Sequence, residues 1–152
     1  MIRKDRERNS DFAFNVFKNC EYASIATINS DGTAYSVPIS VVLVDNFIYF
    51  HGATVGKKLE NIAINKKICI SAVTNTRLVP EELSSEFESA VAFGECELVT
   101  DIPEKKKALK AICEKYAKSH IHLFEETVSR YIDKTAICKI TIEKITGKEC
   151  KF

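Results

Sequence analysis

Six stretches of the chain carry the apolar, β-branched and aromatic runs that are typical of strands. We expect strands at residues 22–28, 34–44, 47–51, 67–74, 89–100 and 135–145. Two short turns, Asn29-Ser30-Asp31-Gly32 and Asp45-Asn46, separate the first three of these runs. Because such turns are too short for a crossover, the pattern predicts antiparallel neighbours and not a βαβ unit.

Between the strands, apolar residues recur at helical spacing, which predicts helices. These run from Asn9-Ser10-Asp11 to about Asn19, over 55–64, from Asp101-Ile102-Pro103 onward, and over 124–131. Residues 1–8 read as a charged arm, 76–88 as a loop rich in Glu and Ser, and 146–150 as a tail. The sequence therefore predicts one domain over residues 1–152, mainly β, with six antiparallel strands closed into a small barrel and flanked by helices.

Two residues interrupt their strands. Pro38 removes a ladder donor, so it belongs at an edge, at a bulge, or where the backbone serves another purpose. Gly94 lies in the middle of the fifth strand and indicates a bulge or the close approach of another backbone or a ligand.

Composition narrows the function classes. The 152 residues hold 22 basic and 21 acidic side chains, well mixed, for a net charge of +1, which argues against a nucleic-acid-binding protein. The charged N-terminus lacks the apolar segment of a signal peptide, and no apolar run reaches the ~20 residues of a membrane span. We expect a cytoplasmic protein without a membrane partner, its six cysteines reduced.

The stretch from Tyr49 to Lys58 combines a strand end, a Gly-containing turn and the first turn of a helix. Lys57 and Lys58 fall where the helix dipole is positive and the backbone N–H groups lack partners, which is unfavourable by roughly 0.3–1 kcal/mol each. An anion such as phosphate would turn this pair into a binding site. The alternative is two solvated lysines on a surface helix.

Other chemistry finds little support. The chain has no Walker loop, no dinucleotide fingerprint, no nucleophile elbow and no zincin motif. His120 and His122 could place two imidazoles on one face of a strand, but no third ligand lies near them in sequence, so we predict no metal site. Acidic residues are scattered, which leaves a hydrolase without candidate residues.

Four segments in order carry a resemblance to a known family: 35–40, 48–58, 91–94 and 145–148. They read Tyr-Ser-Val-Pro-Ile-Ser, then Ile-Tyr-Phe-His-Gly-Ala followed by Gly-Lys-Lys, then Val-Ala-Phe-Gly, then Ile-Thr-Gly-Lys. The series resembles the pyridoxamine-5′-phosphate-oxidase-like flavoproteins. Within them it is most similar to the nitroimidazole-resistance (Nim-type) branch, which the charged opening and Leu78-Val79-Pro80 also resemble.

The resemblance implies a Greek-key split barrel that works as a homodimer, with FMN at the subunit interface. It implies that the turn with Gly52 and Ala53, and the pair Lys57-Lys58, hold the FMN phosphate. Many relatives carry Arg-Lys there, and lysine lacks the planar fork that grips phosphate at two points. His51 would lie beside the flavin near the substrate, or would simply hydrogen-bond a neighbour at a strand end.

The resemblance also assigns the strand whose backbone lies along the flavin ring to Val37, Pro38, Ile39 and Ser40. The alternative for these four residues is a purely structural edge strand. Phe93 and Gly94 either pack near the flavin or only form a bulge.

Three functions remain open. The first is an FMN-dependent oxidoreductase acting on a small aromatic or nitro-aromatic substrate, in which the cofactor supplies two-electron transfer. The second is a flavin- or haem-binding protein without turnover, for which His120 and His122 are the residues to check. The third is a barrel that has lost its cofactor. Oxidation of vitamin B6 itself is disfavoured, because basic residues for the substrate phosphate are not found toward the C-terminus.

Overall fold

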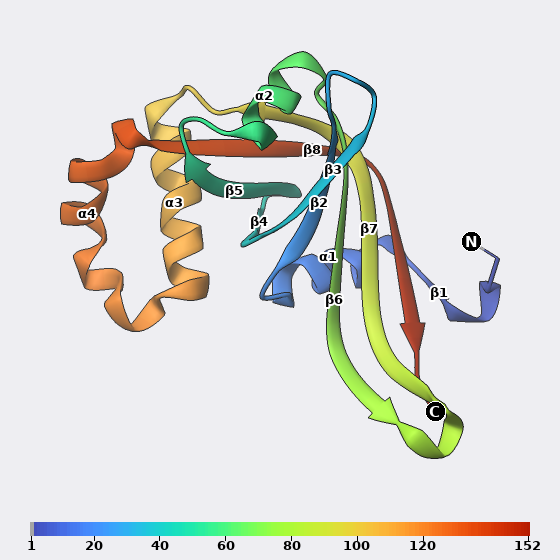
Figure 1. The fold of residues 1–152 in the computed structure, drawn as a ribbon. Coiled ribbons are helices and arrows are strands. Elements are labelled where there is room, and N and C mark those ends of the chain that lie inside the picture. Colours follow the sequence, from blue (N-terminus) through green and yellow to red (C-terminus); the bar gives the residue numbers. More distant parts are fainter. Residues whose placement is uncertain (1) are drawn as a thin grey trace.

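A computed structural model describes residues 2–152 of the chain (Figure 1). The α-helices are α1 (Ser10–Asn19), α2 (Lys57–Ile64), α3 (Ile102–Tyr116) and α4 (Phe124–Tyr131). The strands are β1 (Glu7–Arg8), β2 (Ala23–Ile28), β3 (Ala34–Ile39), β4 (Val42–Val44), β5 (Phe47–Ala53), β6 (Lys67–Val79), β7 (Ser84–Leu98) and β8 (Thr135–Cys150). Short 3-10 helices are η1 (Lys4–Arg6), η2 (Pro80–Glu82), η3 (Lys118–Leu123) and η4 (Ile132–Lys134).

The eight strands form one antiparallel sheet in the order β3-β2-β6-β7-β8-β5-β4, with β1 beside β8. The predicted mainly β, antiparallel architecture with flanking helices is confirmed. The strand count is eight and not six, because the charged arm contains β1 and a bend at Ser40-Val41 divides residues 34–44 into two strands. The sheet is also not closed by hydrogen bonds. Its two end strands, β3 and β4, are consecutive in the chain, so the sheet curls back on itself and leaves a split between them.

Local signals placed several boundaries correctly. The side chain of Asn9 caps α1 by accepting a hydrogen bond from the Phe12 N–H at 3.0 Å. Asp101 caps α3 in the same way. At the turn before β5, Asp45 and Asn46 adopt φ values of +49° and +67°, the left-handed conformation that hairpin turns require.

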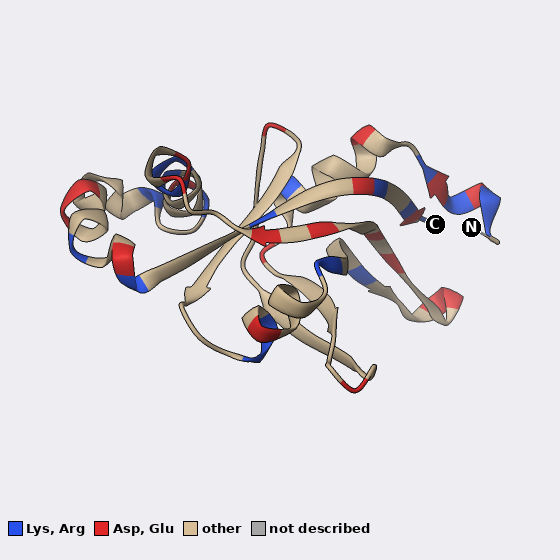
Figure 2. Cartoon of the chain, turned by 90° about the horizontal axis from the view of Figure 1, so that it is seen from above, with Lys and Arg blue, Asp and Glu red and all other residues tan. Residues whose placement is uncertain are grey.

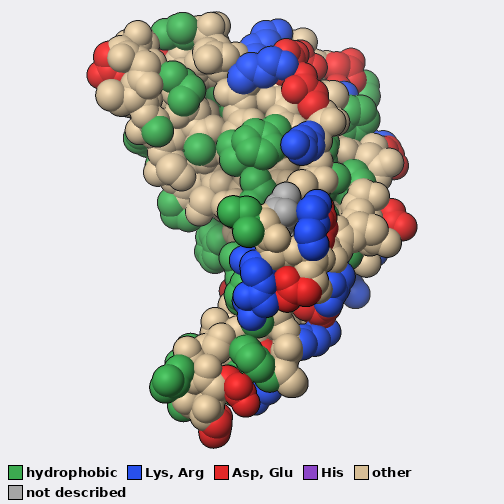
Figure 3. Space-filling model, turned by 90° about the vertical axis from the view of Figure 1, so that its right-hand side faces the viewer, with side chains coloured by type: hydrophobic (Ala, Val, Ile, Leu, Met, Phe, Trp, Pro, Cys, Tyr) green, Lys and Arg blue, Asp and Glu red, His purple; other side chains and the backbone are tan. Residues whose placement is uncertain are grey.

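The loop predicted for residues 76–88 is wrong. Strand β6 continues to Val79, η2 makes the turn, and β7 begins at Ser84. Arg77 lies opposite Glu86 in this hairpin, and its Nε donates to the Glu86 carboxylate at 2.8 Å. Polar residues fit these strands because the hairpin extends beyond the rest of the sheet (Figure 1), where residues 75–78 and 80–83 are exposed. Hydrophobic side chains are exposed at its tip (Figure 3), where Leu83 is 96% exposed.

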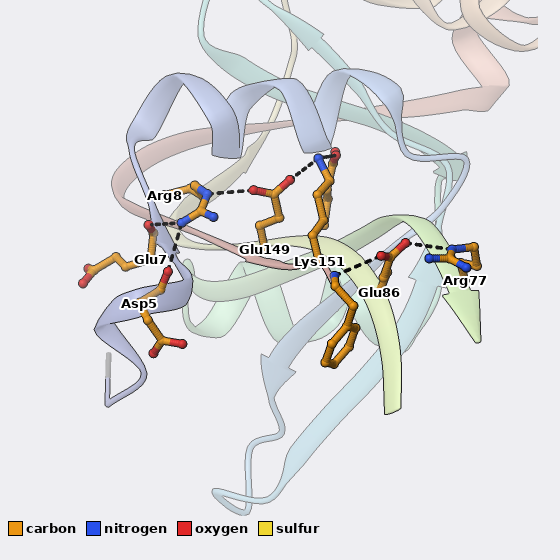
Figure 4. A network of polar contacts seen from close by, with 9 residues as sticks. Asp5, Glu7, Arg8, Arg77, Glu86, Glu149 and Lys151 are labelled. Atoms are coloured by element: carbon orange, nitrogen blue, oxygen red, sulfur yellow. Dashed lines mark hydrogen bonds and ion pairs between the residues drawn. The ribbon is translucent and has the colours of Figure 1, made fainter. Parts of the chain in front are cut away.

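The tail predicted for residues 146–150 is also wrong, because β8 continues to Cys150 and pairs with both β7 and β1. A polar network holds this end of the sheet together (Figure 4). Arg8 donates to Glu149 at 2.8 Å, and Lys151 pairs with the same carboxylate. The backbone N–H of Phe152 donates to Glu86 at 3.0 Å. The sequence pattern gave no sign of this because the partners come from distant segments.

Alternation along β5 divides the core into two parts. Ile48 and Phe50 face the main cluster, inside the curled sheet with α1 and α2. Phe47 and Tyr49 face the opposite side, where α3 packs. A third cluster joins α4 to α3, and Figure 1 shows these two helices side by side at one end of the molecule. Strand β5 therefore separates two distinct environments.

Charged residues of both signs are interspersed along the ribbon (Figure 2). Among residues 2–152, no helix combines the length and the apolar character needed to cross a membrane. All six cysteines are free thiols.

Candidate functional site

The turn between β5 and α2 forms the basic end of a helix. Gly56 has φ +138°, which only glycine adopts without strain, and its carbonyl accepts the N–H groups of Leu59 and Glu60. Within residues 2–152, no side chain caps the start of α2. The first N–H groups of the helix therefore remain available to an anion beside Lys57 and Lys58.

The two lysines point in different directions. The Lys57 ammonium lies 3.9 Å from Glu60 and is largely exposed. The Lys58 ammonium lies 5.4 Å from the ring centroid of Phe50, which fits a cation–π contact. A Cβ at position 52 would lie 3.9 Å from that ammonium, an ordinary van der Waals contact, so Lys58 lies along the end of β5 beside Gly52.

His51 lies on the opposite face of β5 from Phe50 and Gly52, because side chains alternate along a strand. It lines a cavity beside α3 and α4, and its ring stays accessible to solvent. Burial, and after it the charge of Lys58, lower the pKa of His51 below its ordinary value near 6.5. The lowered pKa favours the neutral imidazole, in which one nitrogen donates and the other accepts a hydrogen bond.

Residues 37–40 occupy the end of β3 and the bend that follows it. Strand β3 pairs with β2 on one side, and no other strand of the described chain lies along its second side, so Pro38 is in an edge strand as predicted. Val37 and Ile39 belong to the same core cluster as Phe50, while Pro38 is exposed. One edge of this backbone is thus open to a ligand, and Ser40 begins the bend into β4.

Tyr116 and Lys115 hold the bend in place from α3. The Tyr116 hydroxyl accepts the Val41 N–H at 3.0 Å and lies 2.8 Å from the Glu21 carbonyl, to which it donates. The Lys115 ammonium donates to the Val41 carbonyl at 2.8 Å, and burial lowers its pKa. The sequence analysis did not identify this role, because the backbone partner of the Tyr116 hydroxyl lies 75 residues away and leaves no local signal.

Asn61 is a second residue that sequence reasoning missed. It is fully buried, and its amide donates to the side-chain oxygens of Thr27 at 3.0 Å and Asn29 at 2.8 Å. These bonds fix α2, and with it Lys57 and Lys58, to the hairpin between β2 and β3. The helical spacing gave no signal for this, because Asn61 lies about 200° around the helix from Leu59 and its partners are in another segment.

Phe93 and Gly94 lie apart from this group, on β7, which β8 separates from β5. The register of β7 and β8 shifts between these two residues, which confirms the predicted bulge. A Cβ on Gly94 would lie 2.0 Å from the Thr141 carbonyl oxygen, so strand β8 by itself accounts for the glycine. Phe93 is 46% exposed.

The alternation of His120 and His122 suggested a strand, and this prediction is wrong. They are in η3, where their rings stack with centroids 6.1 Å apart, and Ser119 hydrogen-bonds His120 Nδ1 at 2.9 Å. Short 3-10 turns carry no periodicity that distinguishes them from strands in so brief a segment. Among residues 2–152, no three His, Cys, Asp or Glu side chains are grouped to hold a metal ion.

Solved structures with this fold include several flavin-binding proteins. A candidate 5-nitroimidazole antibiotic resistance protein from Bacteroides thetaiotaomicron is 21% identical, with a TM-score of 0.76 over 93% of this chain and 84% of its own. An FAD-binding protein from Mycobacterium smegmatis is 18% identical, with a TM-score of 0.71 over 97% and 99%. An FAD- and haem-binding protein from the same organism is 17% identical, with a TM-score of 0.77 over 97% and 74%.

A comparison with curated protein sequences finds no match. The sequence model described as pyridoxamine 5′-phosphate oxidase matches residues 15–149, which take in the second half of α1, the other three α-helices and the strands from β2 to β8 except the last residue of β8. The chain therefore belongs to the pyridoxamine 5′-phosphate oxidase family.

Proposed function

We propose that the chain binds FMN as a homodimer, with the flavin at the subunit interface, and reduces small aromatic or nitro-aromatic substrates. The observation that carries the proposal is the pair Lys57-Lys58 at the uncapped start of α2, in a member of this family. The neighbours described as FAD-binding support a flavin cofactor, and the choice of FMN rests on the family and on the site at the start of α2, which is sized for a single phosphate. The likeness to the candidate nitroimidazole resistance protein supports the substrate class.

The residues of the turn fit a phosphate. Two ammonium groups and the free N–H groups of α2 supply positive charge and hydrogen-bond donors, and Gly56 has no described atom within 4 Å of where a Cβ would lie. Lys58 would leave the Phe50 ring to reach the anion, at the cost of a contact worth about 0.5–1 kcal/mol. Gly52 and Ala53 would line the approach, and the open edge at 37–40 would offer backbone groups to the flavin ring.

Bound FMN would supply two-electron transfer. The chain contributes orientation and an acid. The neutral His51 imidazole would donate a hydrogen bond from its ring N–H to a polar group of the substrate. A proton would come from the imidazolium form, which the lowered pKa makes a stronger acid than free imidazolium and which returns to neutral imidazole on giving it up. Tyr116 and Lys115 hold the backbone of Val41, the residue directly after the segment 37–40.

The test is FMN titration of the full chain, followed by visible absorbance after removal of excess flavin. Each lysine bound to phosphate is expected to contribute about 1.5–3 kcal/mol, so Lys57→Ala/Lys58→Ala should weaken binding by at least about 100-fold. Lys66→Ala/Lys67→Ala removes the same charge beyond the other end of α2 and should leave FMN affinity within about threefold. Lys57→Arg should tighten binding, since the guanidinium grips phosphate at two points.

Equal FMN binding by both double variants, or no uptake by the unmodified chain, would refute the phosphate site. Turnover is tested separately by reducing the bound flavin and adding a nitro compound. Reoxidation faster than by air supports the oxidoreductase. Reoxidation at the rate of air favours a flavin-binding protein without turnover.

A further inference from the structure

A cavity of about 330 Å³ lies between α3, η3 and α4, next to the ends of β5 and β8. Its walls are mostly apolar, with Leu109 and Ile112 from α3 and Phe124 and Val128 from α4. His51 reaches it from β5. Packing in this part of the molecule is thus incomplete, although the helices around it are well formed.

The chemistry of the lining restricts what can enter. Among the described residues that line the cavity there is no Lys, Arg, Asp or Glu, and the polar groups are imidazole and hydroxyl groups such as those of His51, Thr127 and Tyr131. An ion placed against this lining would lose part of its hydration without a partner of opposite charge, which is unfavourable. A neutral molecule with one or two hydrogen-bonding atoms meets no such penalty.

We propose that this cavity binds one small, neutral, planar molecule of one or two rings, with a polar substituent directed toward His51. Its volume supports that size, since an apolar cavity of about 150 Å³ accepts benzene. The combination of an apolar wall and a few convergent polar groups is the usual composition of small-molecule sites.

The position of His51 links the cavity to the basic turn. Along β5, Phe50 and Gly52 face Lys58, and the residue between them faces the cavity. A molecule in the cavity would therefore lie one strand thickness from a phosphate held by Lys57 and Lys58. The binding of this molecule to the cavity is independent of the proposed function. Its role as the substrate of the flavin rests on the proposed function.

Binding is tested on the full chain without FMN, by calorimetric titration with nitrobenzene and with 4-nitrobenzoate. We expect nitrobenzene to bind and the anion to bind at least about tenfold more weakly, because its carboxylate finds no cation in the lining. Thr127→Trp places an indole in the cavity and should weaken nitrobenzene binding at least about tenfold. Ser129→Trp adds the same group to a position of α4 outside the lining and should change affinity less than about twofold.

A second measurement needs no variant. Cys113 lines the cavity and Cys69, on β6, does not, yet both thiols are partly buried and in both burial raises the pKa. Nitrobenzene should slow alkylation of Cys113 by N-ethylmaleimide and leave Cys69 unchanged, as read by peptide mass spectrometry.

Absence of nitrobenzene binding, tighter binding of the anion, or equal protection of both cysteines would overturn the proposal. Nitrobenzene binding by a chain that takes up no FMN would support the cavity and refute the proposed function. FMN uptake without nitrobenzene binding would refute the cavity proposal and support the flavin site.

Discussion

Replacement of Gly94 by alanine tests whether β7 and β8 lie too close together at this position to accept a Cβ. The new Cβ would lie 2.0 Å from the Thr141 carbonyl oxygen and 3.2 Å from the Ile142 Cα, both backbone atoms that no side-chain rotation can move away. Ordinary contact begins near 3.4 Å, so the strands must separate by about 1.4 Å (3.4 minus 2.0) at this point. Such a shift exceeds what a ladder hydrogen bond tolerates.

The magnitude follows from these displacements. Overpacking costs about 1–3 kcal/mol, and one or two lost ladder hydrogen bonds add about 0.5–1.5 kcal/mol each. We therefore expect Gly94→Ala to lower the free energy of unfolding by about 3 kcal/mol. For a chain of this length, that corresponds to a fall in Tm of roughly 6–12 °C, measurable by calorimetry.

Gly52→Ala is the matched control, because it also adds a methyl group to a strand glycine. Its Cβ would meet only the Lys58 ammonium, at 3.9 Å, so the Tm should stay within about 2 °C of the parent. A Gly94→Ala protein as stable as this control would refute the argument from strand approach. If that stable protein also lost FMN binding, the glycine would be serving the cofactor, as the resemblance to the flavoproteins suggested.

Two further predictions concern α3. Tyr116→Phe leaves the buried Val41 N–H without its acceptor, so we expect the free energy of unfolding in urea to fall by about 1–3 kcal/mol. Hydrogen exchange at the Val41 amide should become faster, and an unchanged exchange rate would show that the hydroxyl does not hold the bend. Glu104 accepts hydrogen bonds from Lys139 at 2.8 Å and from Tyr49 at 2.7 Å, and these bonds lower its pKa below 4.5. The contribution of the ionised carboxylate to the free energy of unfolding is therefore present above pH 4.5 and is lost as the pH falls through the lowered pKa. Glu104→Gln should therefore lower the free energy of unfolding by about 1 kcal/mol at pH 7, a small value because the Lys139–Glu104 pair is partly exposed. The difference in stability between the two proteins should shrink toward pH 3. A difference that stays constant with pH would contradict a stabilising role of the ionised Glu104.

Features governed by neighbouring residues were predictable from the sequence. Asn9 and Asp101 start helices, Asp45-Asn46 turns a hairpin, and Pro38 lies at an edge, each for a reason contained in a few residues. The position of Lys57 and Lys58 in the first turn of α2 also followed from local pattern.

Features governed by distant partners were not predictable. The extension of β6 and β7 depends on contacts such as Arg77 with Glu86, formed between strands that each look like a polar loop. The direction of His51 depends on the register of β5, and a strand end gives no pattern long enough to fix which face is buried. Tyr116 and Asn61 are polar anchors whose partners lie in other elements.

Strand β8 gives the fold a particular order of assembly during synthesis. It pairs with β5, β7 and β1, yet all three are translated before it. Until residues 135–150 leave the ribosome, β5 and β7 each present an unpaired edge, the kind of surface that promotes association between nascent chains. At about 5–20 residues per second, β8 itself takes roughly 1–3 s to make. The strands β3-β2-β6-β7 can pair before then, as can β4 and β5, but these two parts of the sheet are joined only when β8 is added.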